Sequence, residues 1–195
     1  MKIGTSLASY PVFPDWIFEG QLELDDGITS KIISDLHSFQ KKGAISETTF
    51  GWLSTKNIFA GSNVFSLNKL TNALFYDNAT SHFRLGPDNS KIELTESWAM
   101  GIKPSYSIPV NIERHRWYQS VLFLQTEKNG SNLFLDQFGS KLYSTPIGVQ
   151  PYTHYIEAQK NKIVFFPAHI PWGFTPNLSG SNTIVVCSSF IINKS

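Results

Sequence analysis

The 195-residue chain carries 16 Lys and Arg against 15 Asp and Glu, and hydrophobic residues make up 41% of it. This balance excludes a disordered chain, and it lacks the basic excess that is typical of nucleic-acid binders. No window has enough apolar residues to span a bilayer, and the first 16 residues lack the apolar stretch of a signal peptide. We therefore expect a single domain over residues 1–195, in the cytoplasm, with no membrane and no nucleic-acid partner.

The chain has a single cysteine, Cys187, in the apolar run TIVVCSSFII. An internal disulfide is therefore excluded, and a small buried residue in a reducing compartment is the simplest interpretation. Aromatic residues reach 14% of the chain. Large flat side chains anchor interfaces, so we predict interface roles for Trp16, Trp52 and Trp117. A core role is the alternative for each of them.

Two segments near the N-terminus have helical periodicity. Apolar residues recur at three- and four-residue spacing from Ile28 to Phe39, which predicts a helix near residues 28–42. A second helix is predicted near residues 66–78, where three leucines share a face and Ser66 is the candidate N-cap. The run QLELDD reads as a short strand that precedes the first helix.

From residue 91 the apolar pattern changes to short β-type runs separated by turn residues. These runs are KIELTESWAMGIKP, QSVLFLQT, SNLFLDQ, THYIEAQ, KIVFFPA and NTIVVCSSFII. This order, in which helices come first and many short strands follow, predicts an α+β chain. Residues 1–90 would supply a strand, helices and loops, and residues 91–192 a β-sandwich or jelly-roll core flanked by the N-terminal helices.

Several motifs occur in the order seen in one known family. YPVFPDWIFEGQL looks like that family's entry strand, GWLS resembles a Gly-Trp-Gln-Ser turn, and SWA is similar to a Ser-Trp-Ala-Asn strand. SVLFL and LFLDQ resemble two later strands, and FPAHIPWGFTPN resembles the closing turn. The family is an oxygenase-like group common in marine bacteria and their phages, within the Fe(II)/2-oxoglutarate oxygenases. The resemblance implies a double-stranded β-helix, a cupin-like jelly roll.

The resemblance also implies positions for the metal ligands, usually two histidines and a carboxylate. Counting from the motifs on either side places the first ligand pair at Asn111 and Glu113, and the distal histidine at Trp172. Asparagine is a poor ligand for Fe(II), and tryptophan is not a metal ligand. The arginine expected on the last strand, to pair with 2-oxoglutarate, is absent from Ser181-Asn182-Thr183. This register predicts a degenerate site with no catalytic residue and no metal.

A second assignment of the ligand positions retains a complete set of metal ligands. Glu113 and His115 are alternate residues, which share a face in an extended segment, and His169 follows 54 residues after His115. Together they would supply a carboxylate and two imidazoles, a set that suits Fe(II).

Two functions follow from these two registers. The first is a non-catalytic module with no cofactor, acting as a structural or interaction protein that binds protein partners or assembles with itself. The resemblance places such a module in a phage virion, or in the cytoplasm of the host cell. The alternative is a divergent dioxygenase (a hydroxylase) that uses Fe(II) and 2-oxoglutarate.

Overall fold

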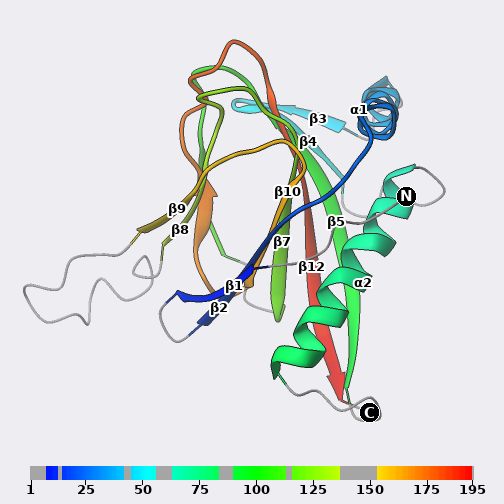
Figure 1. The fold of residues 1–195 in the computed structure, drawn as a ribbon. Coiled ribbons are helices and arrows are strands. Elements are labelled where there is room, and N and C mark those ends of the chain that lie inside the picture. Colours follow the sequence, from blue (N-terminus) through cyan, green and yellow to red (C-terminus); the bar gives the residue numbers. More distant parts are fainter. Residues whose placement is uncertain are drawn as a thin grey trace, which may run out of the picture.

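The computed structural model describes residues 8–12, 15–41, 45–55, 63–83, 90–112, 116–136 and 153–194. They form two helices and twelve strands in two antiparallel sheets (Figure 1). The helices are α1 (Asp26–Lys41) and α2 (Asn63–Phe83). The strands are β1 (Ala8–Val12), β2 (Asp15–Gln21), β3 (Ile45–Thr48), β4 (Gly51–Ser54), β5 (Ser90–Ile102), β6 (Ile108–Asn111), β7 (Tyr118–Gln125), β8 (Leu133–Asp136), β9 (Thr153–Ile156), β10 (Lys162–Pro167), β11 (Trp172–Phe174) and β12 (Thr183–Lys194).

The larger sheet has eight strands in the order β1-β2-β10-β7-β12-β5-β4-β3, and the smaller has four in the order β6-β11-β8-β9. Strands distant in the sequence are therefore neighbours, as when β12 pairs with both β5 and β7. Two antiparallel sheets with these crossovers form a double-stranded β-helix, which confirms the predicted fold class. The N-terminal strands β1 to β4 extend the larger sheet at both of its edges.

The larger sheet is buried on both faces. On β7, Val121 and Phe123 face the smaller sheet, while Leu122 and Leu124 belong to the core under the helices. Because successive strand residues point to opposite faces, this burial explains the uninterrupted apolar run VLFL. The inner core fills the space between the sheets, and the outer core joins the larger sheet to the helices.

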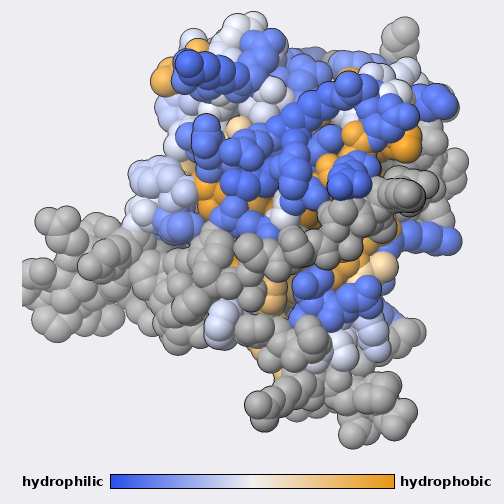
Figure 2. Space-filling model, viewed as in Figure 1, coloured by the Kyte–Doolittle hydropathy of each residue, from blue (hydrophilic) through white to orange (hydrophobic). Residues whose placement is uncertain are grey.

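The helices cover the outer face of the larger sheet. In Figure 1, α2 runs along β5 and β12, and α1 lies beside β3 and contacts α2. Phe75 on α2 is fully buried, and its ring stacks on Phe165 of β10 with 5.1 Å between centroids. The view in Figure 2 shows mostly hydrophilic residues on the described surface, with small hydrophobic areas between them. Among the described helices, none has the length and apolarity to cross a membrane.

Several boundaries differ from the sequence predictions. Helix α2 begins at Asn63 and ends at Phe83, so Ser66 lies inside it rather than at its N-cap. Phe83 packs against Phe18 with 6.1 Å between ring centroids, and this packing favours the extra C-terminal turn. GWLS forms strand β4 rather than a turn, because Gly51 to Leu53 pair with β5. The strand predicted over QLELDD lies earlier in the chain, as β2.

The stacked ring of Phe75 leads to a test of the outer core. Phe75→Ala should lower the free energy of unfolding by about 3–5 kcal/mol, because the surrounding rings cannot close the cavity it leaves. The matched control is Tyr76→Ala on the same helix, where the side chain is 36% exposed. It should change that free energy by no more than about 0.5 kcal/mol. Urea unfolding measures both, and equal losses would contradict the placement of Phe75.

Candidate functional site

A largely apolar cavity of about 330 Å³ lies where β4 and β5 of the larger sheet meet β6 and β11 of the smaller one. Its walls combine buried residues with exposed residues at the mouth. The lining consists of Phe50, Leu53, Ser54, Trp98, Met100, Ile108, Pro109, Val110, Asn111 and Trp172. None of these side chains is ionisable. Its size suits a small molecule.

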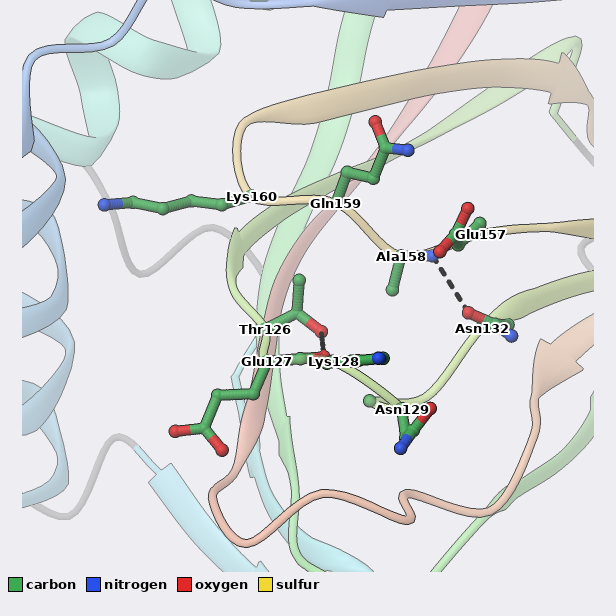
Figure 3. Close-up of a pocket in the computed structure, with 10 residues that line it drawn as sticks. Thr126, Glu127, Lys128, Asn129, Asn132, Glu157, Ala158, Gln159 and Lys160 are labelled. Carbon is green, nitrogen blue, oxygen red and sulfur yellow. Dashed lines mark hydrogen bonds between the residues drawn. The ribbon is translucent and has the colours of Figure 1, made fainter.

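A second cavity, of about 390 Å³, lies between the loops that join β7 to β8 and β9 to β10 (Figure 3). Its lining includes Glu127, Lys128, Glu157 and Lys160, all exposed. The backbone N–H of Ala158 donates to Asn132 Oδ1 over 2.9 Å and ties the two loops together. Exposed charges of both signs are well solvated, and their arrangement indicates no particular reaction or ligand. The apolar cavity is therefore the stronger candidate for the functional site.

Strand pairing brings Asn111 and Trp172 together. Their Cα atoms are direct partners across the β6–β11 ladder, and both residues line the apolar cavity. Side chains of opposed residues in an antiparallel pair lie on the same face of the sheet. Two positions that the sequence register singled out, 61 residues apart, are therefore neighbours at one site. Their assignment as former ligand positions stays a prediction.

Gly173 permits the close approach of the strands around Trp172. A Cβ at this position would lie 2.7 Å from the backbone oxygen of Ile108 on β6 and 2.6 Å from the ring of Phe134 on β8. Any larger residue would push the neighbouring strands away. The glycine thus holds Trp172 against β6.

Trp172 is the most enclosed polar group in the cavity wall. Its side chain is 1% exposed, and its ring makes edge contacts with Phe166 and Phe174, with centroids 5.9 and 5.8 Å apart. Its indole Nε1–H is buried and has no hydrogen-bond acceptor in the described part of the chain. An unpaired donor in an apolar wall costs free energy unless a ligand or water accepts from it.

The other polar groups of the wall are Ser54 and Asn111. The Ser54 hydroxyl accepts a hydrogen bond from the backbone N–H of Ala99 (2.8 Å) and donates to the carbonyl of Thr55 (3.0 Å). It is therefore committed to holding β4 against β5. Asn111 is exposed, and its Oδ1 accepts from the N–H of Ile112 (2.9 Å), so its amide Nδ2 is the group available to a ligand.

The rival metal ligands are described only in part. His169 is exposed in the turn between β10 and β11, which the Ile170 N–H closes by donating to the Pro167 carbonyl over 3.1 Å. Glu113 and His115 lie outside the described residues. Among the residues that are described, no three His, Cys, Asp or Glu side chains cluster closely enough to hold a metal ion.

His154 and Thr183 do not line the apolar cavity. His154 is half-buried on β9, because β9 pairs with β8 and places His154 opposite Leu135. Thr183, in the segment without the expected arginine, is fully buried, and its Oγ1 accepts from the backbone N–H of Ser131 over 3.1 Å. That position therefore serves the packing of β12.

The three tryptophans predicted as interface anchors all contact the outer core, and an interface role for the half-buried Trp16 and Trp117 stays a prediction. Trp52 is 6% exposed and belongs to the outer core, so its side chain is not offered to a partner. Trp16 and Trp117 are half-buried and pack against that same core. Sequence reasoning missed Trp98 and Met100 as cavity residues, although their i, i+2 spacing on β5 is the signal that they share a face.

Cys187 takes no part in a site. It is 1% exposed in the inner core, and burial raises the pKa of its thiol above the ordinary value. A buried neutral thiol is neither a nucleophile nor a metal ligand.

Comparisons with known proteins agree with the fold. No protein-family model and no curated protein sequence matches the chain. Solved structures do match. The non-heme α-ketoglutarate-dependent epimerase SnoN from nogalamycin biosynthesis superimposes with a TM-score of 0.69 at 10% identity, over 90% of this chain and 77% of that one. A Pseudomonas putida prolyl-4-hydroxylase gives 0.63 at 11% identity, over 90% and 91%. An oxidoreductase of the 2OG-Fe(II) oxygenase family from Burkholderia pseudomallei gives 0.58 at 7% identity, over 82% and 77%. The chain shares the double-stranded β-helix of these neighbours.

The comparisons overturn the prediction that no cofactor is involved. HygX from Streptomyces hygroscopicus, solved with nickel and 2-oxoglutarate bound, superimposes with a TM-score of 0.62 at 9% identity, over 89% of this chain and 81% of that one. A second structure of HygX holds iron. The fold is therefore one that carries a metal and 2-oxoglutarate in its neighbours, and the prediction of no cofactor is wrong. The described residues alone do not fit an iron, since Trp172 and Asn111 occupy the cavity wall.

The burial of Cys187 can be tested with a thiol reagent. In the folded protein Cys187 should stay unreactive toward an aromatic disulfide at pH 8, and it should react fully once urea unfolds the chain. Ser30→Cys, on the exposed side of α1, is the control and should add one fast-reacting thiol. Absorbance of the released thiolate counts the reacted groups. Reaction of Cys187 in the native protein at the rate of the control would contradict its burial.

Proposed function

We propose that the chain is a divergent Fe(II)/2-oxoglutarate-dependent dioxygenase, with Glu113, His115 and His169 as its candidate metal ligands. The observation that carries the proposal is the superposition on enzymes of this class over about nine-tenths of the chain. An apolar cavity of small-molecule size, where the two sheets meet, supports it further.

The topology supports this ligand set. Strands β6 and β11 are antiparallel, with Asn111 ending β6 opposite Trp172, which begins β11. The chain that leaves β6 and the chain that enters β11 therefore lie at the same end of the strand pair. Glu113 and His115 follow Asn111 by two and four residues, and His169 precedes Trp172 by three. A carboxylate and two imidazoles would be the facial set that Fe(II) oxygenases use, with positions left for 2-oxoglutarate and O₂.

A structural or interaction module is the second candidate, and the sheet edges favour it. Strand β1 ends the larger sheet and pairs only with β2 among the described strands. Strand β9 ends the smaller sheet and carries Tyr155, which is 62% exposed. Edge strands of this kind accept a strand from a partner chain. Membership of a phage particle stays a prediction from the family resemblance.

Metal binding tests the proposed enzyme directly. Protein prepared without oxygen and supplied with Fe(II) should hold about one iron per chain, measured by elemental analysis, and should consume 2-oxoglutarate in air. Glu113→Ala and His169→Ala should each abolish iron binding and 2-oxoglutarate consumption, because a facial site with one ligand missing holds the metal poorly. The control is His37→Ala, an exposed histidine on α1, which should leave both unchanged.

The opposite results separate the two candidates. If both site variants still bound iron at full occupancy, Glu113 and His169 would be excluded as metal ligands. A chain that takes up no iron and elutes with partner proteins or as a large assembly would replace the enzyme by the interaction module.

A further inference from the structure

The rim of the apolar cavity consists of apolar side chains that remain accessible to solvent. Pro109 and Val110 on the edge strand β6 are exposed, Val110 to 48%. Phe50 and Leu53 from the β3–β4 hairpin are half-buried and line the same cavity. A single exposed apolar residue needs no explanation, but four of them around one opening indicate a binding surface.

We infer that this cavity binds a neutral, apolar small molecule, and that the four rim residues select it. As the substrate class of the site, this inference rests on the proposed function, whereas binding can be measured without turnover. Trp98, Met100 and Trp172 also line the cavity but are nearly fully buried. The rim therefore supplies most of the surface that a bound molecule would contact.

The absence of charge in the lining determines the class of molecule. None of the ten lining residues is ionisable, although charged residues make up 16% of the chain. A charged molecule would lose hydration on entry without gaining an ion pair. The second cavity shows the contrast, because Lys128, Lys160 and two glutamates line it. The apolar cavity therefore matches a molecule without charge.

The walls of the cavity are fixed by backbone hydrogen bonds, so the binding surface is preformed. The N–H of Lys103 donates to the Phe50 carbonyl over 2.9 Å, and the Ser54 hydroxyl accepts from the N–H of Ala99 over 2.8 Å. These bonds hold the β3–β4 hairpin against β5, while β6 is held by its pairing with β11. A volume of about 330 Å³ lies in the range of small-molecule pockets, and a preformed pocket avoids the entropic cost of ordering.

The test uses two dyes with one ring frame, the neutral N-phenyl-1-naphthylamine and its anionic analogue 8-anilino-1-naphthalenesulfonate. The fluorescence of both dyes rises in apolar surroundings, so titration gives the affinity of each. The sulfonate group lies beside the anilino group, and it therefore cannot stay in water while both aromatic parts enter the cavity. The unmodified protein should bind the neutral dye about tenfold more tightly than the sulfonate, because only the sulfonate loses hydration.

A charge placed on the rim should change this preference. Val110→Lys should weaken binding of the neutral dye about threefold, because it removes an apolar contact. It should tighten binding of the sulfonate about two- to fivefold, the worth of an exposed ion pair. Leu178→Lys is the control, because Leu178 is 75% exposed and lies outside the lining. It makes the same change of charge and should leave both affinities unchanged.

The inference is overturned if the neutral dye does not bind, or if the unmodified protein binds the sulfonate equally or more tightly. It is also overturned if Leu178→Lys changes the affinities as much as Val110→Lys does, because the dyes would then bind elsewhere. If Val110→Lys does not fold, Pro109→Lys places the same charge on the same rim.

The dye titrations and the iron measurements have separate outcomes. Selective binding of the neutral dye without iron uptake or 2-oxoglutarate consumption would support the site and contradict the proposed function. Iron uptake and 2-oxoglutarate consumption without binding of the neutral dye would support the proposed function and contradict this inference.

Discussion

The structure depends on the burial of the central strands of the larger sheet on both of their faces. Strands β7, β10 and β12 lie between the helices on one side and the smaller sheet on the other. Alternate residues of these strands therefore belong to different cores, and most of their residues are apolar. The exceptions include the buried Ser120 on β7 and Ser188 on β12. Loss of either covering layer would expose a continuous apolar surface, so the helices and the smaller sheet stabilise the same three strands from opposite sides.

The candidate site follows from how the two sheets meet. The smaller sheet has only short strands, and its edge strand β6 contains Pro109. Proline has no backbone N–H to donate to a neighbouring strand, and an edge strand tolerates it because one side of that strand needs no donor. Where β6 and β11 approach β4 and β5, the inner core does not close, and a cavity remains. Gly173 holds β11 close to its neighbours, which places Trp172 in the wall.

The wall of this cavity carries no ionisable side chain. The comparisons show enzymes with iron, or with nickel and 2-oxoglutarate, on the same fold. Here an indole and an amide stand opposite each other across β6 and β11, while candidate ligands come two to four residues away along the chain. None of the residues that line the apolar cavity is ionisable, so contacts with a bound molecule there would depend on shape and hydrogen bonding rather than on charge.

The sequence by itself determined the elements with strong periodicity: the helix α1, the long strands, and the succession of strands that follows the second helix. It also showed that Asn111 and Trp172 occupy two of the positions where the family resemblance places metal ligands. The tertiary structure decided what short segments become. Strands β6 and β11 have four and three residues, too few for a periodic signal, and they exist because hydrogen bonds to neighbouring strands hold them. The burial of Trp172, its unpaired N–H and the cavity depend on residues far apart in the chain, and only the packing of one sheet on the other brings them together.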